Sequence, residues 1–367
     1  MNSSDIAFLK ELCEAPSPSG YEWPAAEVFR RRLTGTADSI ETSVMGSVHA
    51  TLLGKGKGKK KAPSVMIAGH IDEIGFMVKY IDDNGYITFD AIGGIDSAIL
   101  PGSRVTLYAT GKGTGGPTKP TVLRGMIGRK PIHLIEADER KNVTPMEKLI
   151  VDLGLSGEQA RELIRIGDCF TFGLGFEEYG DGFAASRAFD DKMGAFICAR
   201  VMEEIAAAKK AKGDLYAVAT VQEEIGTRGA ITSTFSLDPD IGISVEVDHA
   251  TDYPGIEKSR YSEVNCGKGP VIARGPNINP MLFERLVAAA EAADVEYQIG
   301  PEPRGTGTDA NPMQITKSGK VAGLVSVPLR YMHTPSEVLK LDDLDSTIRL
   351  LTRFILDLEP DIDWIPR

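Results

Sequence analysis

Histidine and acidic residues recur in five short segments that lie next to apolar, strand-like or helical stretches of the 367-residue chain. Ligand crevices of open α/β sheets form outside the carboxyl ends of the strands, so such segments are candidate sites. The first segment contains His70 and Asp72, which follow the apolar residues 65–67 and would point the same way along an extended backbone. This arrangement suits an imidazole metal ligand whose second nitrogen is oriented by a carboxylate. A structural histidine at the end of a strand would explain the segment equally well.

Two further segments contain adjacent acids. Asp190 and Asp191 open an apolar helical pattern, where they could cap the helix and complement its dipole, or bridge two metal ions. Capping is the commoner role of an isolated pair. Glu223 and Glu224 directly follow the apolar stretch 215–221, and adjacent acids at a strand end are costly unless they bind a cation. One of the two glutamates could be a ligand and the other a general base.

The last two segments add oxygen and nitrogen donors. Glu246 and Asp248 share one face of a strand by period two, and either could be a hard oxygen ligand. His333 precedes the terminal helical pattern and, taken alone, would more often be structural. Together, two histidines and at least three carboxylates would supply a site for two divalent ions, which zinc, cobalt or manganese would fit. A spare carboxylate would deprotonate a water bridging the metals, and the metals would polarise a carbonyl.

Periodicity predicts that an α/β domain carries these segments and that a β-rich insertion interrupts it. Residues 1–76 and 183–367 are assigned to the α/β domain, and residues 77–182 to the insertion. The predicted strands are 47–53, 64–68, 76–81, 86–89, 105–108, 215–221, 241–247 and 321–327. The predicted helices include 145–153, 157–166, 281–293, one carrying Met193, Ile197, Val201 and Ile205, and one carrying Leu344, Ile348, Leu351 and Ile355. The lysine–glycine run 54–61 is interpreted as a solvated hairpin connection between the first two strands.

Composition excludes several classes of partner. The chain has 41 Lys and Arg against 52 Asp and Glu, a net charge of −11 that would repel nucleic acid or an anionic membrane. The first twelve residues lack the order of a secretory signal, and no apolar stretch reaches the roughly 20 residues of a membrane span. Four widely spaced cysteines predict reduced core thiols. We therefore expect a cytoplasmic protein.

The segments 69–76, 189–192, 222–226, 307–310 and 331–335 resemble, in chain order, those of the glutamyl and tetrahedral aminopeptidase family of dinuclear metallopeptidases. This resemblance spans essentially the whole chain. It implies a mixed-sheet α/β/α di-metal exopeptidase domain with an inserted, mostly β dimerisation domain. It also implies dimers that assemble into a hollow tetrahedral dodecamer, and short peptides as substrates.

The resemblance further implies a role for each site residue. Asp190 would bridge two divalent ions, Zn²⁺ or Co²⁺ with Mn²⁺ as an alternative. The metal ligands implied are His70, Asp190, Glu224, Glu246 and His333, with Glu223 as the general base and Asp72 orienting His70. Glu246 stands where the family usually has aspartate, and because glutamate is one methylene longer, Asp248 could substitute for it. We expect Glu246 to be the ligand.

The sequence therefore predicts a metal-dependent aminopeptidase, and two alternatives remain open. A metal-independent glycosidase could use Glu223 with a second carboxylate, but it gives no role to His70 and His333. A non-enzymatic metal-binding scaffold gives no role to Glu223. No charge pattern in the sequence indicates which amino-terminal residue would be removed.

Overall fold

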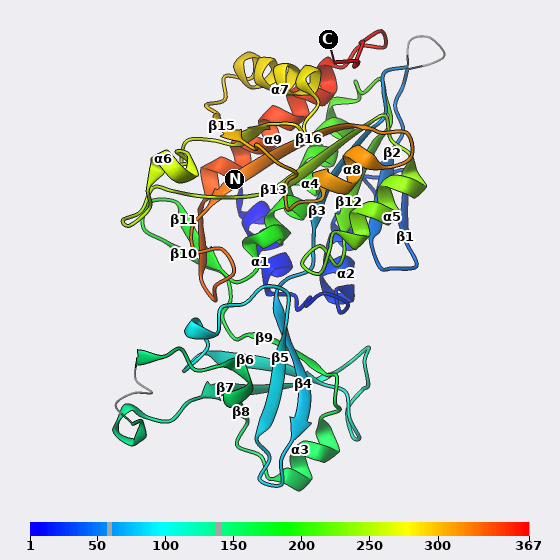
Figure 1. Cartoon of the computed structure of the whole chain (residues 1–367). Coiled ribbons are helices and arrows are strands. Elements are labelled where there is room, and N and C mark those ends of the chain that lie inside the picture. The colour runs from blue at the N-terminus through cyan, green and yellow to red at the C-terminus, as the bar shows by residue number, and fades with distance from the viewer. Residues whose placement is uncertain (57–60, 137–140, 367) are drawn as a thin grey trace.

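The computed structural model describes residues 1–56, 61–136 and 141–366, and its strands form two large bodies, an open sheet and a barrel (Figure 1). The open sheet has eight strands in the order β1–β2–β12–β3–β13–β16–β14–β15. In that order their bounds are Ser39–Thr42, Val48–Leu52, Leu215–Thr220, Val65–His70, Ile241–His249, Val321–Leu329, Val271–Arg274 and Gln298–Pro301. The strands β12, β3, β13 and β16 are mutually parallel, so their carboxyl ends meet at one edge.

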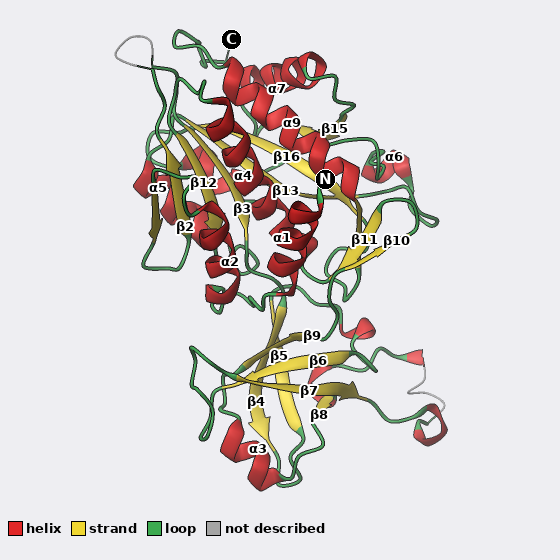
Figure 2. Cartoon of the chain, turned by 180° about the vertical axis from the view of Figure 1, so that it is seen from behind, coloured by secondary structure: helices red, strands yellow, loops and turns green. Residues whose placement is uncertain are grey.

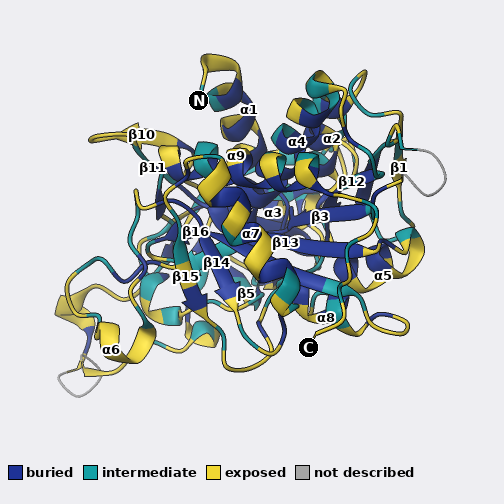
Figure 3. Cartoon of the chain, turned by 90° about the horizontal axis from the view of Figure 1, so that it is seen from above, coloured by how far each residue is buried: buried dark blue, intermediate teal, exposed yellow. Residues whose placement is uncertain are grey.

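Helices cover both faces of this sheet, which gives the expected α/β/α layers. One face packs against α4 (Phe189–Ala208), flanked by α1 (Ser3–Glu14), α2 (Trp23–Leu33), α7 (Pro280–Ala292) and α9 (Leu341–Asp357), most of which stand in front of the sheet in Figure 2. The other face packs against α5 (Arg228–Leu237) and α8 (Ala310–Ile315). Figure 3 shows buried strands running beneath helices whose outer surfaces are exposed. The predicted apolar stripe of α4 is confirmed, because Met193, Ile197, Val201 and Ile205 are all buried.

The predicted hairpin between β2 and β3 is wrong, although both strands exist. Strand β12 lies between them, antiparallel to β2 and parallel to β3. The physical reason is that β12 is apolar along its length and is buried by strands on both sides, which a sequence-adjacent pairing of β2 with β3 would prevent. Residues 57–60 of the connecting run lie outside the described residues.

The second body is a closed barrel in the order β4–β5–β8–β7–β6–β9. The bounds are Gly75–Ile81, Ile87–Ile92, Ile150–Asp152, Thr121–Gly128, Arg104–Ala109 and Cys169–Phe172. Phe76, Phe89, Phe170 and Phe172 pack together at its centre, with the rings of Phe76 and Phe170 stacked at 4.8 Å. The predicted hairpin of β4 and β5 is confirmed. Helix α3 (Gly157–Leu163) is shorter than predicted.

The predicted helix 145–153 is wrong. A single 3₁₀ turn, η5 (Met146–Lys148), is followed by strand β8, which pairs with β5 and β7. Leu149 and Val151 are buried at a spacing of two, and so short an apolar run cannot be assigned to helix or strand by periodicity alone.

The remaining elements are a small sheet and several short helices. A three-stranded sheet contains β10 (Glu177–Tyr179), β11 (Phe183–Ser186) and β17 (Glu337–Lys340), and short helices are η2 (Ser97–Ile99), η3 (Ile132–Leu134) and α6 (Lys258–Tyr261). All four cysteines are free thiols, three of them buried, with Cys266 partly exposed. Among the described residues, no helix has the length and apolar character to cross a membrane.

Candidate metal centre

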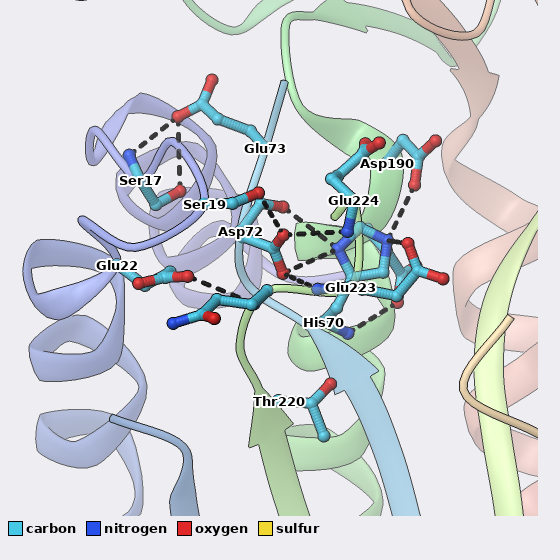
Figure 4. A network of polar contacts seen from close by, with 12 residues as sticks. Ser17, Ser19, Glu22, His70, Asp72, Glu73, Asp190, Thr220, Glu223 and Glu224 are labelled. Carbon is cyan, nitrogen blue, oxygen red and sulfur yellow. Dashed lines mark hydrogen bonds and ion pairs between the residues drawn. The ribbon is translucent and has the colours of Figure 1, made fainter. Parts of the chain in front are cut away.

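The predicted chemical residues converge at the carboxyl edge of the open sheet. His70 ends β3, Glu223 and Glu224 follow β12, and Glu246 lies in β13. Asp190 comes from the first turn of α4, and His333 from the connection between β16 and β17. Figure 4 shows His70, Asp190 and the two adjacent glutamates pointing toward one another, with Asp72 beside them. Parallel strands bring these side chains together because their carboxyl ends share one edge.

Asp190 lies between the two histidines. Its Oδ1 is 3.0 Å from His70 Nε2 and its Oδ2 is 3.3 Å from His333 Nε2. The His333 Nε2 atom is also 3.3 Å from Glu224 Oε1. The His70 Nε2 atom is 3.7 Å from Glu246 Oε2 and 3.9 Å from Glu223 Oε2. A carboxylate whose two oxygens face two different imidazoles has the arrangement of a ligand shared by two ions.

Hydrogen bonds on the far side of each imidazole orient the rings. His70 Nδ1 is 3.1 Å from the Asp72 carbonyl oxygen, and His333 Nδ1 is 2.7 Å from the Gly94 carbonyl oxygen. Such contacts fix the tautomer and leave Nε2 for a ligand. The Asp72 carboxylate also accepts hydrogen bonds from the backbone N–H groups of Glu223 at 3.0 Å and Glu224 at 3.1 Å. It therefore positions the glutamate pair as well as the imidazole.

The cluster carries an excess of negative charge in a buried setting. Burial raises the pKa of Glu223 to about 8, and it also raises the pKa values of Glu224 and Glu246. Burial would lower the pKa of His333, but its contacts with Asp190 and Glu224 raise it to about 11. These carboxylates therefore favour a positive charge beside them, whether from a protonated imidazole or from a bound cation.

The residues present fit divalent cations. His70, Asp190 and Glu224 each offer a donor atom, all within 4.8 Å of one another, and His70, Asp191 and Glu246 form a second such group. The Oδ1 atoms of Asp191 and Asp309 are buried and receive no hydrogen bond from the described residues. Mixed imidazole and carboxylate donors are those used by zinc, cobalt and manganese. An uncompensated buried carboxylate oxygen is costly, and a cation would offset that cost.

A cavity of about 710 Å³ opens onto this cluster. Its lining includes His70, Asp190, Glu223, Glu224, Glu246 and His333, and continues past them to Asp248 and Glu302. Asp248, the predicted substitute for Glu246, belongs to neither donor group and lies farther along β13. Burial raises the pKa of Asp248 to about 6, and burial and the neighbouring Asp248 raise the pKa of Glu302.

Sequence reasoning missed Glu337, which holds two residues of the cluster. Its Oε2 accepts the backbone N–H of Asp190 at 3.0 Å, and its Oε1 accepts that of His333 at 2.9 Å. The residue is 2% exposed. In the sequence, Glu337 could be noticed only because it lies four residues after His333 in the same segment. An acid before a helical pattern is ordinarily explained by capping, so this position alone did not indicate a role in the site.

Sequence reasoning also gave no role to Glu73 or Asp309. Glu73 is buried between Arg187 and Lys192, with its Oε1 2.9 Å from the Lys192 ammonium. Asp309 Oδ2 accepts the Thr220 hydroxyl at 2.5 Å. Neither pairing can be found from the sequence, because the partners lie far apart along the chain.

Comparison with known proteins agrees with this geometry. The family model for M42 glutamyl aminopeptidases matches residues 50–350. The lysyl aminopeptidase of Pyrococcus furiosus is 35% identical over 99% of both chains. The crystal structure of the TET aminopeptidase of Thaumarchaeota archaeon SCGC AB-539-E09 has 30% identity, a TM-score of 0.88 and 97% coverage of both chains.

A third relative is the TET1 peptidase of Pyrococcus horikoshii, with 28% identity and a TM-score of 0.82 over 96% of this chain and 100% of the other. It is described as able to assemble into a tetrahedron or a large octahedral shell. The family model covers well over half of this sequence, and the P. furiosus relative matches it nearly from end to end. The chain therefore belongs to the M42 glutamyl aminopeptidase family.

Proposed function

We propose that this metal-dependent aminopeptidase removes amino-terminal residues from short peptides by means of two divalent ions held at the carboxyl edge of the open sheet. The observation that carries the proposal is Asp190, whose two carboxylate oxygens face His70 and His333 separately. His70 and Glu246 would hold one ion, and His333 and Glu224 the other, with Asp190 shared between them. Zn²⁺, Co²⁺ or Mn²⁺ when bound would supply Lewis-acid polarisation of the scissile carbonyl and of the attacking water.

Glu223 is the general base in this proposal. Its carboxylate lines the cavity beside His70 and its backbone is held by Asp72. It takes a proton from the attacking water as the new C–O bond forms, and it delivers that proton to the leaving nitrogen as the C–N bond breaks. Asp72 is a positioning residue, since its carboxylate fixes the 223–224 backbone while its carbonyl oxygen orients His70.

Neither alternative function uses the whole cluster. A glycosidase would need two carboxylates and no histidine, yet both imidazoles here face Asp190. A metal-binding scaffold would leave Glu223 without a task, and the family of the chain is one of hydrolases.

The proposal extends to assembly and location. The barrel domain would form dimers, and the dimers a tetrahedral dodecamer, as the described assemblies of P. horikoshii TET1 suggest. Val122 and Met126 on β7 are 58% and 55% exposed, which supports a protein contact on the barrel. Four free thiols are typical of a reducing compartment, so we place the enzyme in the cytoplasm.

Hydrolysis of a panel of aminoacyl chromogenic substrates tests the catalytic proposal. The metal-stripped protein should be inactive, and Zn²⁺, Co²⁺ or Mn²⁺ should restore turnover. Glu223→Gln should lower kcat by roughly 10²–10⁴-fold while both ions still bind, because only proton transfer is removed. Glu284→Gln, a change on the exposed face of α7, is the matched control. Turnover indifferent to chelation, or a fully active Glu223→Gln enzyme, would contradict the mechanism.

A further inference from the structure

The part of the active-site cavity beyond the metal cluster has an acidic wall. Asp248 and Glu302 line it together with apolar and small residues such as Val271, Ala273 and Leu324. Among the described residues that line the cavity there is no lysine or arginine. The two carboxylates therefore do not serve as counter-ions to a lysine or arginine of the cavity lining.

Strand geometry places the two acids on the substrate side of the sheet. Asp248 follows Glu246 on the same face of β13, and two residues of a strand advance by roughly 6.6 Å. On the neighbouring side, β14 and β15 pair through Ala273 and Gly300, and the pairing continues as Glu302 N–H donates to the Arg274 carbonyl oxygen at 2.9 Å. Glu302 therefore shares a face with Gly300 by alternation.

Gly300 lies beside Asp248, where a side chain would not fit without a shift of Val271. A Cβ atom at this position would lie 2.8 Å from Val271 Cγ1 and 3.4 Å from Asp248 Oδ2. Any larger residue would therefore collide with Val271, and its Cβ would touch the Asp248 carboxylate. The cavity lining thus runs from the proposed ion ligand Glu246 to Asp248 and Glu302.

Among the described residues neither carboxylate has a lysine or arginine partner, although His249 lines the same cavity and acts on Glu302. No ion pair joins Asp248 or Glu302 to a lysine or arginine, and both side chains are partly buried. Two neighbouring acids withdrawn from water repel each other unless a cation lies between them. His249 supplies at most one positive charge to these two acids, so a cationic group of the substrate, which enters this cavity, would complete their neutralisation.

Resting on the proposed function, we infer that Asp248 and Glu302 form the side-chain pocket of the enzyme and select peptides whose amino-terminal residue is lysine or arginine. With the α-amino group and scissile carbonyl at the metal cluster, the four-carbon stem of lysine extends along the face of β13. Its ammonium then reaches the two carboxylates. An amino-terminal glutamate is repelled by the same pair, and leucine leaves both acids unpaired.

Lysyl and norleucyl substrates test this pocket, because norleucine has the same stem without the ammonium. The metal-loaded enzyme should show a kcat/KM at least about tenfold higher for the lysyl than for the norleucyl substrate, with the glutamyl substrate lowest. In the Asp248→Asn/Glu302→Gln double variant the lysyl-to-norleucyl ratio should fall at least about tenfold. Glu284→Gln should keep the ratio of the unaltered enzyme.

Product inhibition gives a measurement that needs no variant. Free lysine should inhibit the unaltered enzyme at least about tenfold more tightly than free norleucine. Equal inhibition, or a preference for norleucyl or glutamyl substrates, would overturn the pocket assignment while leaving the aminopeptidase intact. Failure to cleave any substrate with any of the three metals would instead contradict the proposed function itself.

Discussion

At the scale of single residues, backbone hydrogen bonds position the cluster together with the side-chain contacts. Asp190, His333, Glu223 and Glu224 are each fixed by an N–H that donates to a buried carboxylate. The carboxylates that receive these hydrogen bonds are Glu337 and Asp72. These two acids bind no substrate in our proposal, and their task is to set the positions of the groups that do.

Glu337→Gln tests this role. The amide offers one acceptor where the carboxylate offers two, so either Asp190 N–H or His333 N–H loses its buried partner. We expect metal affinity to fall by about 10–100-fold, the usual cost of losing an oriented support for a ligand. Calorimetric titration of the stripped protein measures this directly. Glu359→Gln, at an exposed position, should bind metal normally, and an unchanged affinity in Glu337→Gln would show that the contact is dispensable.

At the scale of elements, the gathering of the candidate site was predictable in part, because the carboxyl ends of parallel strands meet at one edge of a sheet. The structure brings His70, Glu223 and Glu246 together, and each lies at or just beyond the carboxyl-terminal part of a strand, as the sequence predicted. The pairing of β2 with β12 was not predictable, because local pattern does not say which of several apolar strands becomes a neighbour. The strand β8 was missed because three residues cannot show a period.

Glu73 is the other element-scale feature that local pattern could not reveal. Glu73 follows β3 and forms an ion pair with Lys192 of α4 and another with Arg187, which precedes α4. Its Oε1 also accepts the Ser17 N–H at 2.9 Å. Glu73→Gln would leave two buried cations without their counter-charge. We expect a loss of about 3–5 kcal/mol in the free energy of unfolding, measured by urea denaturation. A loss below about 1 kcal/mol would place this contact among ordinary surface ion pairs.

The same residue predicts a pH dependence. Burial opposes ionisation, but Arg187 and Lys192 lower the pKa of Glu73 below its usual value. The stabilisation is therefore complete above the unfolded-state pKa of about 4.3, and it is lost as the pH falls through the lower folded-state pKa. Below pH 4.3 the unaltered protein should lose stability more steeply than Glu73→Gln. Parallel curves would mean that Glu73 is protonated equally in both states.

At the scale of the whole molecule, the barrel presents apolar side chains that its own core does not use. Val122 and Met126 lie on the exposed face of β7 with Arg124 between them, and Ile132 and Leu134 follow along the chain, these four apolar residues being more than half exposed. A monomer rarely leaves such residues together on its surface. Their grouping on the barrel separates the proposed surface for assembly from the edge that carries the catalytic cluster.

Val122→Glu/Met126→Glu tests the assembly. Charges placed inside an apolar contact should shift the sedimentation coefficient to a smaller species, with the circular dichroism spectrum unchanged. Ile315→Glu, at an exposed position on α8 of the open-sheet body, should sediment like the unaltered protein. If both variants sediment alike, β7 does not form the contact.

The hydrogen bonds made by Glu337 and His333 also bear on the order of events during synthesis. The Asp190–Glu337 contact spans 147 positions of the chain, and the Gly94–His333 contact spans 239. A nascent chain that has not yet emerged as far as His333 lacks one imidazole, and it also lacks Glu337, which supports the Asp190 backbone. If the proposed ligands are correct, we expect peptide cleavage to begin only after the barrel and most of the open sheet have been translated.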